Sequence, residues 1–518
     1  MTKRPEHRWQ LPRLAAAMTA LTLILGGVAA QAQDPVRGGT LVLARSQEPL
    51  TLDPNIPADN GSIYAIEQIF DALIEPDREG SGLRPGLAES WEISEDGKVY
   101  TLNLREAYFH NGDPVTTEDV VFSLENAKAN EGYGFVFAPV ETIEAVGDNQ
   151  IRLTLSEPYA PLLSVLSLFT ASIVPKAAYE ADPEGFGSMP IGSGPFKVVE
   201  YARGERLVLE RSDQYWEEGA DGDALPYLDR IEMPYVPEGN SRVLGLQSGD
   251  FDIIEFVPYS QAATVESDPS LNLEVAPVYR LDYVYLNHAQ APLDNKNIRL
   301  ALNHATDHDA ILNVVFFGYG EVPNGFMPKM NYHSADVPVI PYDIAKAKEL
   351  VAEAGYDGTP IVLLIAAGDS NGQQIGNILQ QGWQQAGLNV SIEQVDGGTA
   401  WGMVSDGDYQ AHVSYITSDI NDDDELATLQ ADFNSGTEAF FSRYKNDNMG
   451  EMLAAARRSN DPEERAKLYG EIQNTVYMDG YSVPLNFSPT LTGSSDKVND
   501  LTTSRTGWWW LKDAWLTE

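Results

Sequence analysis

The fold of this chain is decided by residues 87–123, which read LAESWEISEDGKVYTLNLREAYFHNGDPVTTEDVVFS. Within this stretch, residues 98–105 alternate apolar and polar side chains, which is the period of a half-buried strand. The segment HNGDP at residues 110–114 breaks the chain, and TTED at residues 116–119 is a capping box ahead of apolar residues at helical spacing. The stretch therefore predicts a strand, a turn and a helix in succession, as in α/β proteins.

Several residues of this stretch also occur together in one protein family. They are Trp91, Ser94, Asp96, Gly97, Tyr100, Thr101, Leu104, Arg105, Phe109, His110, Gly112, Pro114, Val115, Glu118, Asp119, Val120 and Ser123. In these residues the chain resembles the extracytoplasmic solute-binding proteins of family 5, the peptide and nickel receptors of ABC importers. Similarity to the sequences of this family extends over nearly all of residues 38–490. Each matching residue alone has an ordinary role in folding, so the resemblance identifies a family and says little about the ligand.

The resemblance implies an α/β, two-lobed periplasmic binding protein of type II, cluster C-like, with an enlarged first lobe and a two-strand hinge. The first lobe is expected to be discontinuous, with residues 38–283 joined by residues 486–518 and an extra subdomain. The second lobe is expected over residues 284–485, and the crossings at residues 283–287 and 482–485. A chain of 518 residues is long enough for two such lobes.

The first 32 residues are predicted to be a cleavable signal peptide. A basic start is followed by an apolar run over residues 14–30, and Ala30-Gln31-Ala32 offers a small-residue cleavage site. The chain contains no cysteine, so it has neither a disulfide framework nor a lipobox thiol for lipid attachment. We therefore expect a soluble, monomeric periplasmic protein.

The composition is strongly acidic, with 34 Lys and Arg against 77 Asp and Glu and a formal charge of -43. Such a charge excludes nucleic acid as a partner. It is compatible with attraction of cationic ligands, but a solvated acidic surface is the favoured interpretation. Net charge alone therefore does not choose the substrate.

Each candidate catalytic or metal-binding motif in the sequence lacks a residue that its chemistry requires. His304 and His308 have zinc-ligand spacing, but Ala305 stands where a metalloprotease needs its glutamate base. Ser193 lacks the complete glycine pattern of a nucleophile elbow. The acidic run at residues 419–425 lacks the glycine of a calcium loop. We expect no catalytic residue, metal site or cofactor, and an exported hydrolase is the remote alternative.

Ligand-binding residues are expected beyond the carboxyl ends of parallel strands, where α/β crevices lie. The loop after the strand at residues 361–366 contains Asp369 and Ser370, which are read either as ligand contacts or as a helix cap. The resemblance places Trp401 at an aromatic pocket wall, and a core residue is the alternative interpretation. Ser46 and Gln47, in the loop after the strand at residues 39–44, are further candidates.

The resemblance points most strongly to Asp419, which aligns with the aspartate that binds the peptide amino group in family members. Tyr415 replaces the tryptophan of that segment, and the alignment needs a one-residue insertion. A solvated acidic loop is the competing interpretation. Dipeptide receptors bind the peptide carboxylate through an arginine in the loop after a second-lobe strand, whereas this loop reads Asp369-Ser370-Asn371.

We therefore expect a binding protein that closes over a peptide, or a peptide-like or amine-bearing small solute. It would deliver this ligand to the permease and ATPase subunits of an inner-membrane ABC importer. Oligosaccharide and nickel are the alternative ligands within the family.

Overall fold

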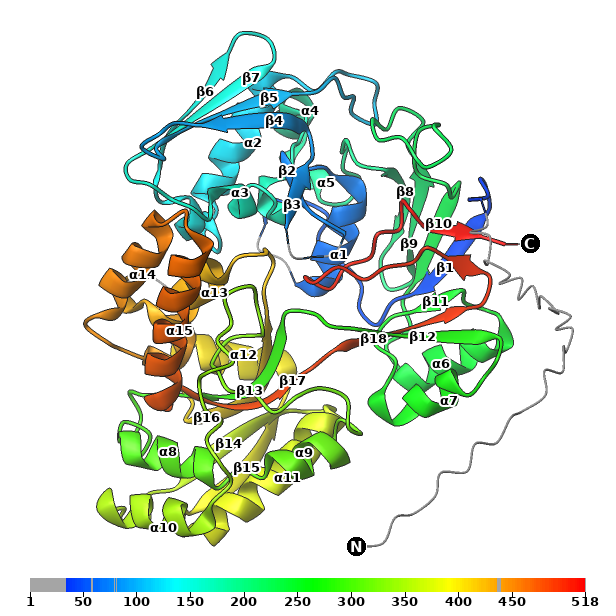
Figure 1. Cartoon of the computed structure of the whole chain (residues 1–518). Helices are drawn as coiled ribbons and strands as arrows, with labels where there is room; N and C mark the ends of the chain where they lie inside the picture. The colour runs from blue at the N-terminus through cyan, green and yellow to red at the C-terminus, as the bar shows by residue number, and fades with distance from the viewer. Residues whose placement is uncertain (1–33, 57–58, 79, 81, 436–438, 518) are drawn as a thin grey trace, which may run out of the picture. The chain divides into compact units, whose positions relative to one another are not determined.

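The computed structural model describes residues 34–517 except 57–58, 79, 81 and 436–438 (Figure 1). The expected signal peptide at residues 1–32 lies outside the described residues. The chain divides into two units, residues 1–35 and 36–518, and the description below concerns the second. Among the described helices, none combines the length and apolarity that a membrane crossing requires.

A seven-stranded mixed sheet contains the first strand of the chain. Its order is β12-β18-β11-β1-β10-β9-β8, and β1 pairs in parallel with both of its neighbours. The strands are β1 (Thr40–Ala44), β8 (Phe196–Ala202), β9 (Arg206–Arg211), β10 (Arg230–Pro234), β11 (Ile253–Ile254), β12 (Leu271–Ala276) and β18 (Thr490–Ser495). Helix α1 (Asn60–Ile69) and the C-terminal Trp508, Trp509 and Trp510 belong to the same hydrophobic core.

A separate antiparallel sheet of four strands lies within residues 88–155. Its strands are β4 (Ala88–Ile93), β5 (Val99–Leu104), β7 (Gln150–Leu155) and β6 (Val140–Val146), in that spatial order. The strand predicted at residues 98–105 is β5, and its side chains alternate in burial. Helix α2 (Thr117–Ala129) begins at the predicted capping box, in which Thr116 and Asp119 bond reciprocally. The prediction of strand, turn and helix is confirmed.

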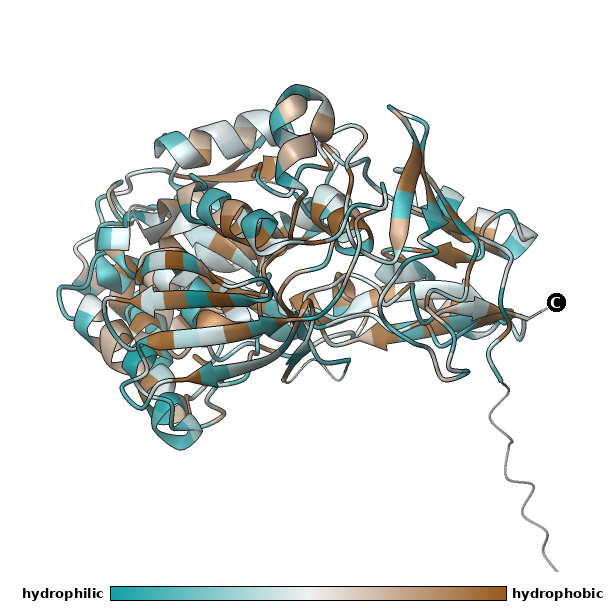
Figure 2. Cartoon of the chain, turned by 90° about the horizontal axis from the view of Figure 1, so that it is seen from above, coloured by the Kyte–Doolittle hydropathy of each residue, from teal (hydrophilic) through white to brown (hydrophobic). Residues whose placement is uncertain are grey.

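A five-stranded sheet has the order β15-β14-β16-β13-β17. Its strands are β13 (Arg280–Leu286), β14 (Ile361–Ala366), β15 (Val390–Val395), β16 (Ala411–Thr417) and β17 (Ser482–Phe487). Strand β14 pairs in parallel with β15 and β16, and α11 (Ser370–Gln385) packs on them through the fully buried Trp383. This is the β-α-β unit that the sequence pattern of residues 361–366, about 373–386, and 389–395 predicts. Apolar segments gather on the strands and inner helix faces in Figure 2.

The remaining elements surround these sheets. In the first part of the chain they are β2 (Ile74–Pro76), β3 (Leu83–Pro85), α3 (Leu162–Val165), α4 (Lys176–Ala181), α5 (Pro183–Phe186), α6 (Gly239–Ser248) and α7 (Ala262–Glu266). Further along they are α8 (Lys296–His304), α9 (His308–Val314), α10 (Ile344–Glu353), α12 (Gly397–Asp406), α13 (Asp423–Ala431), α14 (Met449–Arg458), α15 (Pro462–Met478), β19 (Val498–Asn499) and β20 (Trp515–Leu516).

Among the described strands, the chain passes twice between the seven-stranded and the five-stranded sheet (Figure 1). The connections are residues 277–279, between β12 and β13, and residues 488–489, between β17 and β18. The segments expected to cross, residues 283–287 and 482–485, lie instead almost entirely within β13 and β17, and Val483 is fully buried in the core of the five-stranded sheet. The expected boundary after residue 283 thus divides a single strand. A long apolar strand gives no sequence signal of where its sheet ends.

Candidate functional site

The candidate ligand site is a cavity of about 820 Å³, within the range of small-molecule sites. One side comes from the loop after β1, the start of α1 and the segment after α2. The other side comes from β13, β14, α12, β16 and α13. Ala366 and Thr417, the last residues of the parallel strands β14 and β16, both line it. The cavity therefore lies at the carboxyl ends of parallel strands, where the sequence predicts a crevice.

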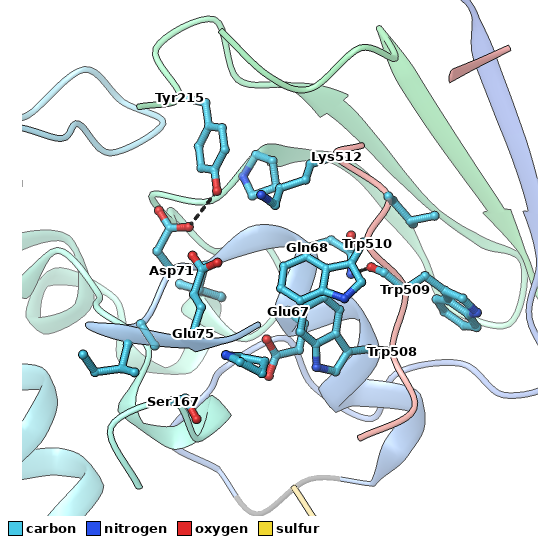
Figure 3. A pocket seen from close by; sticks show the side chains of 16 residues that line it. Glu67, Gln68, Asp71, Glu75, Ser167, Tyr215, Trp508, Trp509, Trp510 and Lys512 are labelled. Carbon is cyan, nitrogen blue, oxygen red and sulfur yellow. Dashed lines mark hydrogen bonds between the residues drawn. The ribbon is translucent and has the colours of Figure 1, made fainter. Parts of the chain in front are cut away.

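A second, much smaller cavity lies beside α1 and the three C-terminal tryptophans (Figure 3). Its lining includes the carboxylates of Glu67, Asp71 and Glu75, and the Tyr215 hydroxyl donates a hydrogen bond of 3.3 Å to Asp71. Its volume of about 30 Å³ holds a single water molecule and no solute. A groove of about 700 Å³ lies between residues 331–337 and α15, and only those two segments line it. The 820 Å³ cavity is therefore the best candidate.

Asp419 lines the cavity just after β16, and it connects the two sides. Its Oδ2 accepts a hydrogen bond of 2.9 Å from the hydroxyl of Tyr133, which follows α2. Burial raises the pKa of Asp419 to about 6, although the bond from Tyr133 acts in the opposite direction. This carboxylate therefore lacks a full set of charge-stabilising partners.

Glu425, in the first turn of α13, is a second carboxylate of the lining and is only 3% exposed. Its Oε2 accepts hydrogen bonds from Ser418 Oγ (2.9 Å) and from the backbone N of Asp419 (3.3 Å). Burial and the neighbouring charge of Asp419 raise the pKa of Glu425 to about 8. Within the part of the chain that the structure describes, no lysine or arginine forms an ion pair with either carboxylate.

Aromatic rings form much of the remaining wall. Trp401 is 47% exposed and Tyr415 is 42% exposed, which is unusual for side chains of this size. The guanidinium of Arg280 stacks on the Tyr415 ring at 3.8 Å while it binds both oxygens of Asp282. His412 is kept neutral because burial lowers its pKa. Exposed rings facing a cavity provide surface for a ligand to cover.

Four of the seven residues predicted to bind ligand line this cavity: Asp419, Trp401, Tyr415 and Gln47. Ser46 does not, because its backbone N and its hydroxyl both bind Glu255. Ligand contact by all of these residues stays a prediction.

The other two predicted residues, in the loop after β14, do not line the cavity either. Asp369 is the N-cap of α11 and accepts a 2.9 Å hydrogen bond from Gly372 N, and the exposed Ser370 is the first residue of that helix. The structure favours the cap over the ligand contact for this loop.

The acidic run at residues 419–425 is not a solvated loop. Asp422 binds Arg465 in a buried bidentate pair at 2.8 Å, and Asp424 binds Arg457 at 2.8 Å. Among the described residues, no group of three or more His, Cys, Asp or Glu is arranged to hold a metal ion. The run therefore contains two arginine-paired carboxylates, Asp422 and Asp424, a third, Asp423, that accepts a hydrogen bond from the backbone N of Tyr332, and the two at the cavity.

Among the lining residues that sequence reasoning missed, Tyr133 and Glu425 are the two that bind Asp419. Tyr133 belongs to no motif, and its partner Asp419 lies 286 residues further along the chain. Glu425 was part of the acidic run that the sequence analysis weighed as a calcium loop. Its inward orientation follows from the start of α13 at Asp423, since Asp422 caps that helix.

Fold and cavity together define the class of the molecule as a two-lobed solute-binding protein. The chain belongs to the bacterial extracellular solute-binding proteins, family 5, whose model matches residues 82–436. The family expected from the sequence is thus confirmed.

The glutathione-binding protein GsiB of Escherichia coli O157:H7 is 28% identical over 522 residues, which cover 98% of each chain. The periplasmic binding protein DppA of Helicobacter pylori, solved with the peptide STSA, superposes with a TM-score of 0.84 at 26% identity. It covers 93% of this chain and 99% of its own. AgaA of A. tumefaciens R10, solved with agropinic acid, has a TM-score of 0.82 at 26% identity, with 93% of this chain and 99% of its own covered.

Proposed function

We propose that this protein is the periplasmic receptor of an ABC importer and that it captures a peptide, or a peptide-like or amine-bearing solute, in the 820 Å³ cavity. The observation that carries the proposal is the pair of Asp419 and Tyr133, which brings a carboxylate and a hydroxyl from opposite sides to one cavity. The relatives support the ligand class, since one is named for glutathione and another was solved with a tetrapeptide.

Asp419 is the proposed anchor for the ligand's ammonium group. A charge-assisted hydrogen bond closed away from water contributes about 1.5–3 kcal/mol. Because the cavity is lined by both sides, a ligand in it stabilises the closed form of the molecule. We place the division between the lobes at the connections 277–279 and 488–489, where the chain leaves one sheet for the other.

The protein is proposed to be exported by its signal peptide, to remain soluble and monomeric, and to deliver its ligand to the permease and ATPase subunits. A catalytic role is not proposed. His304 and His308 have the spacing of zinc ligands, but their rings make structural contacts instead. They lie 2.9 Å from the backbone oxygens of Pro341 and Pro484, respectively.

A thermal-shift screen followed by calorimetry tests the proposal. The screen contains short peptides, glutathione, nickel with histidine, and oligosaccharides. A ligand at about a hundred times its Kd adds roughly 2.7 kcal/mol to stability. We expect a peptide or amine to bind, and Asp419→Asn to weaken it by roughly ten- to hundredfold. Binding only by an oligosaccharide, or unchanged affinity in the variant, would contradict the proposal.

A further inference from the structure

We infer that the solute carries a net positive charge, and that Glu425 selects it through a second cationic group besides the one at Asp419. This inference rests on the proposed function, because it concerns the same cavity. It goes further in excluding anionic peptides such as glutathione.

The first observation is the charge of the lining. Three carboxylates, those of Asp59, Asp419 and Glu425, line the cavity, and no lysine or arginine is among the described lining residues. After residue 33, the residues outside the description contain no lysine or arginine either. A ligand carboxylate would therefore lose its water without gaining a basic partner in this lining.

The guanidinium groups near the cavity are already paired. Arg280, which stacks on Tyr415, binds both oxygens of Asp282 at 2.8 and 3.0 Å. Arg45 is 1% exposed and binds Glu255 at 2.8 Å. Each pair is neutral as a whole, so neither offsets the charge of the lining. Neither arginine is among the lining residues of the cavity.

The three carboxylates differ in what they already bind. Asp59 caps α1 by accepting hydrogen bonds from the backbone N and the hydroxyl of Ser62. Glu425 accepts hydrogen bonds on Oε2 from Ser418 and from the backbone N of Asp419, and the backbone N of Ile420 also stabilises its charge, but none of these donors is cationic. Glu425 is nevertheless almost fully buried. A buried carboxylate in a ligand cavity without a basic partner is a site for a cation.

The aromatic wall favours the same kind of ligand. The rings of Tyr133, Phe135, Tyr285, Trp401 and Tyr415 line the cavity. Ring faces attract ammonium and guanidinium groups, and they cover the hydrocarbon chain that carries such a group. The ligand class is therefore a short peptide or peptide-like amine with a lysine- or arginine-type side group.

Calorimetry with matched tripeptides tests the inference on the wild-type protein. The probes are Ala-Lys-Ala, Ala-Ala-Ala, Ala-Glu-Ala and glutathione. We expect Ala-Lys-Ala to bind at least tenfold more tightly than Ala-Ala-Ala, and Ala-Glu-Ala and glutathione to bind more weakly than either. Equal affinities, or tighter binding of glutathione, would overturn the inference and leave the proposed function standing. Binding by none of the four probes would overturn the inference, and binding by no peptide or amine in the wider screen would overturn the proposed function as well.

Variants then test whether Glu425 is responsible for the preference for the lysine-containing peptide. Glu425→Gln should remove at least tenfold of affinity for Ala-Lys-Ala and less than twofold for Ala-Ala-Ala, whereas Asp419→Asn should weaken both peptides. Glu349→Gln removes the same charge from the exposed face of α10 and is the matched control, expected to bind like wild type. If Glu425→Gln weakened both peptides equally, Glu425 would have a structural role only. The wild-type ranking tests the inference even if a variant fails to fold.

Discussion

Binding of a dicationic peptide should release about one proton at pH 7. Burial holds the pKa of Glu425 at about 8 and that of Asp419 at about 6 in the empty cavity. A carboxyl group with a pKa of about 8 carries about 0.9 proton at pH 7, and one with a pKa of about 6 carries about 0.1. Both protons must leave before the carboxylates can pair with ligand cations, and the pair loses them as a coupled unit.

The sign of the pH dependence follows from the same values. Between pH 6 and pH 8 the affinity should rise about tenfold per pH unit, because one proton leaves on binding. Below about pH 6 the dependence should steepen towards a hundredfold per unit, since Asp419 must then lose its proton as well. Above about pH 8 the affinity should fall again, because the peptide's α-amino group, whose pKa is about 8, then loses the charge that pairs with Asp419.

Calorimetry in phosphate and in Tris, which differ in heat of ionisation, counts the released protons directly. In Glu425→Gln the release at pH 7 should fall to about 0.1 proton, because only Asp419 remains to titrate. The same heat of binding in both buffers for the wild-type protein would refute the reasoning. It would show that both carboxylates are already ionised in the empty cavity.

Other predictions concern closure and stability. Tyr133→Phe removes the hydroxyl that binds Asp419 and should weaken ligand binding by about 0.5–1.5 kcal/mol, as measured by calorimetry. An unchanged affinity would show that this hydrogen bond is absent from the liganded form. Arg457→Ala leaves Asp424 buried without its partner and should lower the free energy of unfolding, measured with denaturant, by about 2–3 kcal/mol. Arg458→Ala breaks a half-exposed ion pair and should lower it by less than about 1 kcal/mol. Equal losses of stability in the two variants would contradict the argument. Burial, then the nearby carboxylates, raise the pKa of Glu67 to about 8, so its contribution to stability is complete below about pH 4 and is lost as pH rises through 8. Glu67→Gln should therefore unfold at a higher temperature than wild type at pH 8.5, a gain that should shrink towards pH 5, and a constant difference would argue against titration.

The sequence predicted the parts of the fold that depend on neighbouring residues. The alternation in β5, the capping box at Thr116 and the β-α-β unit around α11 each rest on a pattern within a few tens of residues. These signals survive in the structure because local preference and tertiary packing agree there. Asp419 was predicted from the resemblance to family 5 and from its place after a strand; it lines the cavity, and its contact with a ligand stays a prediction.

Contacts between distant segments were beyond sequence reasoning. The hydroxyl of Tyr133 meets Asp419 across 286 residues, and nothing around Tyr133 distinguishes it from other aromatic residues of the subdomain. The junctions between the sheets were misplaced for a related reason. Strand β13 is almost wholly buried along its length, and only its hydrogen-bond register with β16 and β17 shows which sheet it joins.

In the acidic run at residues 419–425, composition does not indicate the role of each carboxylate, whereas its partners in the structure do. Its carboxylates look alike in sequence, and a formal charge of -43 makes any acidic stretch unremarkable. In the fold, Asp422 and Asp424 receive arginines from α15 and α14, so they stabilise the packing of those helices. Asp419 and Glu425 receive only hydroxyl and amide donors, although burial costs them as much. Asp419 and Glu425 differ from the other carboxylates of the run in that they line the cavity, and on this placement we infer that they meet a positive charge that arrives with the ligand.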